Sequence, residues 1–184
     1  MKSPLLSAFL AFLGWNGCPS PSLPPQRIDF SEPADQNWLP LNDNVMGGVS
    51  RGAVSWSERG MMWEGETRLE NNGGFSSVRS PWTEVDLSKV RSVTVRCRGT
   101  GGPYKLVFET SSRWYFPYAF ASFSPSEEWI DIAIPLSSFS WSQAFTGDWD
   151  RSAASLERVL RMGLMKYDGT ATAFSLEVAS IAFD

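Results

Sequence analysis

The sequence contains no histidine and only two cysteines, Cys18 and Cys97. Without histidine there is no imidazole base near neutral pH, no Ser-His or Cys-His nucleophile pair and no imidazole ligand for zinc. Two cysteines cannot build a disulfide framework or a four-cysteine metal site. Because these absences exclude many catalytic arrangements, we predict no enzyme activity, no cofactor and no metal ion.

Basic residues are also few, with 16 Lys and Arg against 20 Asp and Glu and a net charge of -4. A protein that binds a phosphate backbone needs a basic surplus, so we expect no nucleic acid partner. The 184 residues, 42% of them hydrophobic, suffice for one domain with a core but not for two ordinary ones. Nine Trp and twelve Phe stand out, and such rings fill cores, anchor partners or support sugars.

The N-terminal apolar run, Leu5 to Leu13, is too short to span a bilayer and has the length of a signal-peptide hydrophobic region. We predict that residues 1–18 are a signal peptide or lipoprotein leader, with Cys18 as a candidate for lipidation. A buried first element or a misassigned start codon are the alternatives. Residues 19–26 are rich in Pro and Ser and predict an extended tether. Such a leader favours a periplasmic or membrane-anchored protein, and without it the protein is cytoplasmic or organellar.

From residue 27 to residue 184 the pattern has the period of two that is typical of half-buried strands. Apolar residues alternate with polar ones in short runs such as Val93, Val95 and Cys97, so we expect Cys97 to be buried. Only residues 152–161 have helical spacing. We therefore predict an all-β fold, a single jelly-roll β-sandwich over residues 27–184 with at most one or two short helical turns. We expect its last strand, which ends at Phe183, to pair beside the first strand near Ile28.

Two segments differ from ordinary strands and turns: NDNVMGGVS at residues 42–50 and ENNGGFSSVR at residues 70–79. Each places amide side chains beside a glycine pair, and glycine permits positive φ and close backbone approach. They are either architectural turns or the lining of one concave site for a polar ligand or a partner. The candidate binding residues are Asn42, Asp43, Met46, Gly47, Gly48, Asn71, Asn72, Gly73, Gly74 and Arg79.

Aromatic residues supply four further candidates: Trp114, Tyr115, Trp141 and Trp149. If residues 113–120 form one strand, Trp114 lies on one face and Tyr115 on the other. These rings either pack in the core or form an exposed surface that binds a sugar or a protein partner.

The two glycine-pair segments, together with WIDIAIPLSSF at residues 129–139, resemble the NADH:ubiquinone oxidoreductase intermediate-associated protein 30 family, the complex I assembly factors. The similarity covers residues 28–184. It implies a galactose-binding-like jelly roll and a non-catalytic role in assembling respiratory complex I. The chain departs from the family at Asn44, where Gly is usual, and at residues 99–102, where a Gly-Asp-Gly turn is usual. The second departure removes a carboxylate that could bind a cation or a sugar hydroxyl.

Three hypotheses follow for the function. The first is a non-enzymatic binding module that contacts a protein partner, such as a subunit of a respiratory complex, and the alternative is an exported module that binds a glycan. We expect contact with a membrane only through the leader or a lipid anchor. The third, a hydrolase, requires two facing carboxylates. Its candidates, Asp43, Glu64, Glu66, Glu70 and Glu109, are explained equally well by ion pairs.

Overall fold

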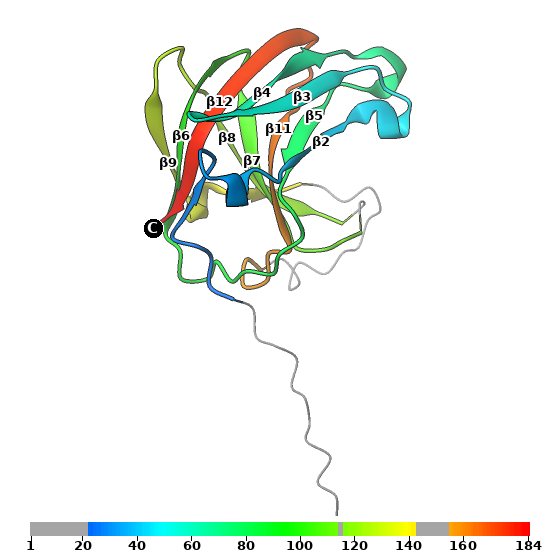
Figure 1. Cartoon of the computed structure of the whole chain (residues 1–184). Coiled ribbons are helices and arrows are strands. Elements are labelled where there is room, and N and C mark those ends of the chain that lie inside the picture. Colours follow the sequence, from blue (N-terminus) through cyan, green and yellow to red (C-terminus); the bar gives the residue numbers. More distant parts are fainter. Residues whose placement is uncertain (1–21, 114–115, 143–154) are drawn as a thin grey trace, which may run out of the picture.

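A computed structural model describes residues 22–113, 116–142 and 155–184. They form two six-stranded antiparallel sheets packed face to face, which confirms the all-β sandwich (Figure 1). The first sheet has the order β3 (Arg51–Ser57), β4 (Gly60–Thr67), β12 (Thr172–Phe183), β6 (Ser92–Thr100) and β9 (Ile130–Pro135), and β1 (Arg27–Asp29) also pairs with β12. The second has the order β10 (Ser140–Trp141), β8 (Tyr118–Phe123), β7 (Tyr104–Glu109), β11 (Arg161–Lys166), β5 (Ser76–Arg79) and β2 (Leu39–Asn42).

The long strand β12 lies in the middle of the first sheet (Figure 1). On one side it pairs with β6, and on the other with β4 up to Val178 and then with β1. A register shift between Val178 and Ser180 marks a β-bulge at this change of partner. Ile28 pairs with Ile181, which confirms the expected contact between the first and last strands.

The core between the sheets consists of apolar side chains from every second position of the strands. Trp63 and Phe174 of the first sheet contact each other with ring centroids 4.9 Å apart, and Trp63 also meets Tyr104 of the second sheet at 5.7 Å. Cys97 is completely buried, as predicted, and burial raises the pKa of its thiol to about 12. This thiol therefore behaves as a small apolar core group.

Within the described residues the helical segments are four short 3-10 turns: η1 (Pro33–Asp35), η2 (Asp43–Met46), η3 (Glu70–Asn72) and η4 (Leu136–Ser138). The helical prediction for residues 152–161 is wrong in its described part. Val159 forms a β-bridge with Val85, and β11 begins at Arg161. The helical spacing did not predict the conformation, because this segment is too short to form a stable helix by itself and its backbone pairs with Val85 instead.

Contacts with the body of the fold begin before β1. Ser22 donates its hydroxyl to the carbonyl of Glu84 at 2.9 Å, and the carbonyl of Gln26 accepts from the backbone of Phe183 at 3.0 Å. The predicted leader, including Cys18, lies outside the described residues. No helix within the described parts of the chain is long and apolar enough to cross a membrane.

Candidate functional site

The two glycine-pair segments meet at the side chain of Asp43, which is completely buried at the start of η2. One oxygen, Oδ1, accepts a hydrogen bond from the backbone of Ser50 at 2.9 Å. The other, Oδ2, accepts from the hydroxyl of Ser50 at 2.5 Å and from the backbones of Gly74 at 2.7 Å and Phe75 at 3.2 Å. We call residues 42–50 and 69–75, which this carboxylate joins, the double-glycine corner.

Hydrogen bonding keeps this buried carboxylate ionised. Burial alone would raise the pKa of Asp43, but the hydrogen bonds from Ser50, Gly74 and Phe75 outweigh burial and lower the pKa below its usual value. Asp43 is therefore charged, and its carboxylate oxygens accept hydrogen bonds from groups inside the fold.

The side chains of Asn42 and Asn71 in the corner also form hydrogen bonds within the fold. Asn42 donates to the carbonyl of Gly52 at 3.0 Å and accepts from the hydroxyl of Ser76 at 2.7 Å, while Asn71 donates to the carbonyl of Gly47 at 3.0 Å. Asn71 and Asn72 adopt left-handed backbone conformations, with φ of 58° and 57°, which asparagine tolerates better than most residues. These contacts give the two segments an architectural role, and a role in binding stays a prediction.

Gly48 allows the backbone to approach the Asp43 side chain. A Cβ built on Gly48 would overlap the carboxylate, whereas a Cβ built on Gly47 meets nothing within 4 Å. Gly47 instead has a positive φ of 89°. The two neighbouring glycines are therefore required for different reasons, one for space and the other for backbone conformation.

We expect Gly48→Ala to lower the free energy of unfolding by more than about 2 kcal/mol, because the new methyl group displaces a buried, hydrogen-bonded carboxylate. Gly47→Ala is the matched control and should lose only about 1 kcal/mol, from backbone strain. Urea unfolding of the two variants measures the difference. Equal losses in the two variants would show that the contact with Asp43 does not require the glycine.

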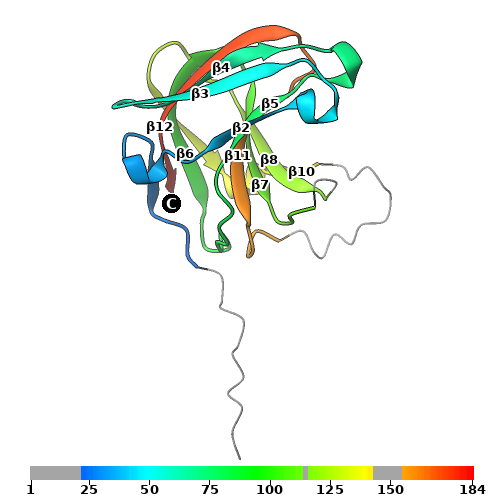
Figure 2. The same cartoon turned by 45° about the vertical axis from the view of Figure 1, so that its right-hand side comes forward.

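Apolar side chains cover the outside of the corner. The exposed fractions are 66% for Val45, 59% for Met46, 43% for Val49 and 46% for Leu69. Figures 1 and 2 show η2 and η3 beside each other at one end of the sandwich. Of these four residues only Met46 is predicted from the sequence. The apolar residues beside the glycine pair were the pattern that could have indicated the others.

Arg79 lies apart from the corner. It is the last residue of β5, three residues beyond Ser76 and thus about 10 Å farther along the strand. Its guanidinium crosses β11 and forms an ion pair with Glu109 of β7. A Cβ on Gly163 of β11 would lie 2.5 Å from Cδ of Arg79, so this glycine makes room for the crossing. The structure therefore does not bring Arg79 together with Asn42, Asp43 and the other candidates.

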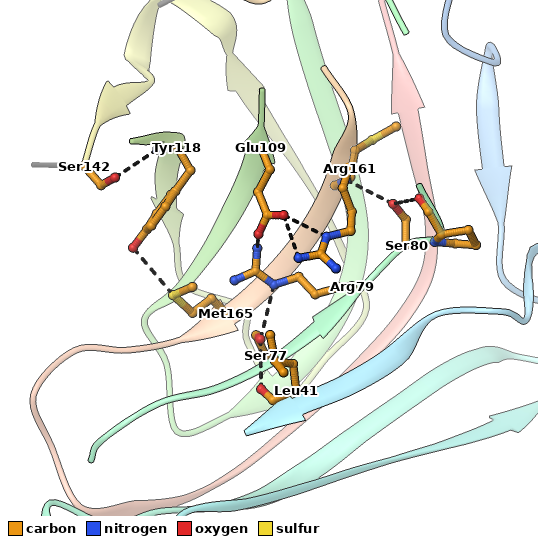
Figure 3. Close-up of polar contacts among 11 residues, drawn as sticks. Leu41, Ser77, Arg79, Ser80, Glu109, Tyr118, Ser142, Arg161 and Met165 are labelled. Carbon is orange, nitrogen blue, oxygen red and sulfur yellow. Dashed lines mark hydrogen bonds and ion pairs between the residues drawn. The ribbon is translucent and has the colours of Figure 1, made fainter. Parts of the chain in front are cut away.

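Glu109 is shared by two arginines, Arg79 and Arg161 (Figure 3). These side chains lie on the face of the second sheet that points away from the first sheet, because their strand neighbours Val78, Phe108 and Met162 point into the core. Arg161 donates from Nε and Nη2 to Oε2 of Glu109, both at 2.7 Å. The side chains of Arg79, Glu109 and Arg161 are 7%, 15% and 21% exposed. Burial lowers the pKa of Arg79, Glu109 raises it, and the charge of Arg161 lowers it. We call these three residues the arginine–glutamate cluster.

Aromatic rings border this outer face. The guanidinium of Arg161 lies over the ring of Trp82 at 4.0 Å, and Nζ of Lys105 lies 4.8 Å from the ring of Phe120 and 5.0 Å from that of Tyr167. Trp82 is 52% exposed and Tyr167 is 46% exposed. Trp82, Tyr167 and Arg161 are not among the residues predicted from the sequence, because no local pattern indicates that residues 82, 105, 161 and 167 come to one face.

The predicted aromatic candidates are only partly described. Trp114, Tyr115 and Trp149 lie outside the described residues, while Trp141 is half-buried in β10 and packs against the core. The described part of residues 113–120 does not form one strand, because Arg113, Phe116 and Pro117 lie outside the strands and β8 begins only at Tyr118.

The described residues contain no group of three or more His, Cys, Asp or Glu that could hold a metal ion. An open hollow of about 460 Å³ beside the corner is lined by Asn42, Arg51, Gly52, Ala53, Glu64, Gly65 and Phe174. Glu64 is the one carboxylate of this lining, so the hollow does not provide the pair that a glycosidase uses.

Comparison with known proteins gives a family and a fold. The family model described as "Complex I intermediate-associated protein 30 (CIA30)" matches residues 28–178. No curated protein sequence matches the chain. Among solved structures, the family 11 carbohydrate-binding module of the cellulosomal cellulase Lic26A-Cel5E of Clostridium thermocellum is similar, with a TM-score of 0.60 and 16% identity over 89% of this chain and 96% of that chain.

A second structure of a family 11 module from Clostridium thermocellum contains a β-1,3-1,4-mixed-linked tetrasaccharide. It matches with a TM-score of 0.52 and 17% identity, over 79% of this chain and 88% of that chain. At these identities the similarity shows a shared β-sandwich fold.

Proposed function

The chain belongs to the complex I intermediate-associated protein 30 family, and we propose that it is a non-enzymatic module that binds a protein partner through the apolar surface of the double-glycine corner. The family is named for its association with complex I, so the partner we propose is a subunit of a respiratory complex.

The observation that supports this proposal is the exposure of Val45, Met46, Val49 and Leu69 on loops that a buried carboxylate holds in place. Clustered exposed apolar side chains are typical of protein interaction sites. A loop that is already ordered loses little conformational entropy when a partner binds. The buried contacts of Asp43 thus contribute to binding by preparing the loop, while the apolar side chains make the contact.

We expect Met46→Glu to weaken partner binding by at least tenfold, because it places a charge in an apolar interface. The free energy of unfolding of this variant should change by less than about 0.5 kcal/mol, since the side chain of Met46 is 59% exposed. Leu39→Glu is the matched control, because Leu39 is 70% exposed on β2, outside the corner. Mild cross-linking of the tagged full-length chain in its own cells, followed by affinity purification and mass spectrometry, measures recovery of the partner.

Recovery of respiratory-complex subunits with the wild type and with Leu39→Glu, but not with Met46→Glu, is the expected result. Equal recovery with all three proteins contradicts a role for the corner. The same spectra report the N-terminus of the protein. Cleavage before or at Cys18, without a respiratory partner, contradicts the assembly role and favours an exported module.

The second candidate function is carbohydrate binding, and the outer face of the second sheet supports it. Exposed aromatic rings such as Trp82 and Tyr167 suit stacking on sugars, and charged side chains beside them suit hydrogen bonds to hydroxyl groups. The solved modules of similar fold include one in complex with a tetrasaccharide. Titration of the full chain with oligosaccharides tests this candidate.

A further inference from the structure

We propose that the arginine–glutamate cluster is the centre of a binding site for a carbohydrate that carries carboxylate groups. The proposal rests on the second candidate function above and names the site and the chemical class of its ligand.

The charge of the outer face favours an anion. Two guanidinium groups, on Arg79 and Arg161, share the single carboxylate of Glu109, and the ammonium group of Lys105 lies on the same face. The nearby carboxylate of Asp168 is paired with Lys166 at 2.5 Å. Because the Arg79 side chain is only 7% exposed, water compensates little of this positive charge. A ligand carboxylate would compensate it.

The two arginines also keep hydrogen-bond donors for a ligand. Arg79 donates from Nε to the hydroxyl of Ser77 at 3.2 Å and from Nη1 to Glu109. Arg161 uses Nε and Nη2 for Glu109. Within the described residues, Nη2 of Arg79 and Nη1 of Arg161 have no hydrogen-bond partner. A guanidinium presents five donors in a plane that suits a carboxylate, so each arginine can bind Glu109 and a ligand together.

The aromatic rings suit a sugar chain rather than an isolated anion. Trp82 lies next to Arg161 at the start of β11, and Tyr167 directly follows its last residue, Lys166. The six residues of β11 span about 20 Å, a distance that accommodates several sugar rings. The rings would stack on the sugar faces, while the arginines between them would bind the carboxylates.

A similar group on the opposite sheet provides a control. Glu177 of β12 is shared by Arg59 and Arg98, and Arg98 lies 5.1 Å from the ring of Trp129. Those arginines are 67% and 34% exposed, and the hollow beside them also contains the carboxylate of Glu127. This group has the same residue types as the arginine–glutamate cluster. Its arginines are more exposed, however, and they do not outnumber the carboxylates beside them.

Calorimetric titration of the full chain with tetragalacturonate, a neutral mixed-linked glucan tetrasaccharide and tetraglutamate tests the proposal. We expect tetragalacturonate to bind at least tenfold more tightly than the other two. Arg161→Gln should reduce this affinity at least tenfold while leaving the Arg79–Glu109 pair in place, and Arg98→Gln should not change it. Trp82→Ala, at an exposed position, should also reduce it and tests the site without removing an ion pair.

The outcomes separate this proposal from the candidate function on which it rests. Equal binding of the neutral and acidic sugars, unchanged in Arg161→Gln, overturns the acidic ligand but leaves carbohydrate binding standing. If neither sugar binds, both are overturned. Binding of tetraglutamate as tightly as tetragalacturonate overturns the assignment of a carbohydrate and identifies an acidic peptide instead.

Discussion

Replacement of Asp43 by alanine is expected to lower the free energy of unfolding by at least about 3 kcal/mol, because it leaves several buried donors without an acceptor. The donors are the backbone and hydroxyl of Ser50 and the backbones of Gly74 and Phe75. For a domain of this size the melting temperature should fall by roughly 6–12 °C. Asp86→Ala is the control, because Asp86 is only partly buried and accepts local hydrogen bonds from its near neighbour Ser88, whose backbone N–H donates at 2.8 Å.

The same substitution should change the response to acid. Since the pKa of Asp43 is lowered in the folded protein, its contribution is fully present above the unfolded value, near pH 4. This contribution is lost as the pH falls through the folded pKa. Wild-type stability should therefore fall more steeply below about pH 4 than the stability of Asp43→Ala, which chemical unfolding at several pH values measures. Parallel pH profiles would show that the charge of Asp43 does not stabilise the corner.

Glu109→Gln should also destabilise the fold by about 3 kcal/mol, because it removes the charge that compensates two poorly exposed guanidinium groups. Glutamine keeps the size of the side chain, so the loss reports charge rather than packing. Glu177→Gln on the first sheet is the matched control. We expect it to lose only about 1 kcal/mol, since Arg59 and Arg98 are more exposed and can turn toward water.

Thermal and urea unfolding of the two glutamine variants measure this difference. A loss in Glu177→Gln as large as in Glu109→Gln would show that the exposure of the arginines does not decide the effect. The stability of Glu109→Gln should also recover partly at high salt, because anions in solution screen the repulsion between Arg79 and Arg161.

The fold was predictable because its information is local. The alternation through Val93, Val95 and Cys97 places one face of β6 in the core, and the structure buries all three. The sequence of β12 also contains a sign of its bulge. Its buried apolar positions are even-numbered at Leu176 and Val178 but odd-numbered at Ile181 and Phe183, which is the phase change that one extra residue produces.

The sites were less predictable because they depend on contacts between distant segments. The sequence left two interpretations for residues 42–50 and 70–79, architectural turns or the lining of one site, and in the structure Asp43 joins the two segments. It could not show that Arg79, at the end of the second segment, belongs to another surface with Glu109 and Arg161. That assignment requires the order of β5, β11 and β7 in the sheet, which no local pattern contains.

The position of β12 limits when the protein can fold during translation. The pair β3–β4 and the pair β6–β9 lie on opposite sides of β12, so the first sheet stays in two pieces until residues 172–183 have left the ribosome. Until then, the edges of β4 and β6 that face β12 have no partner strand, and unpaired edges favour aggregation. While the residues between β4 and β12 are synthesised, the nascent chain therefore stays soluble only if aggregation is slow or a chaperone prevents it.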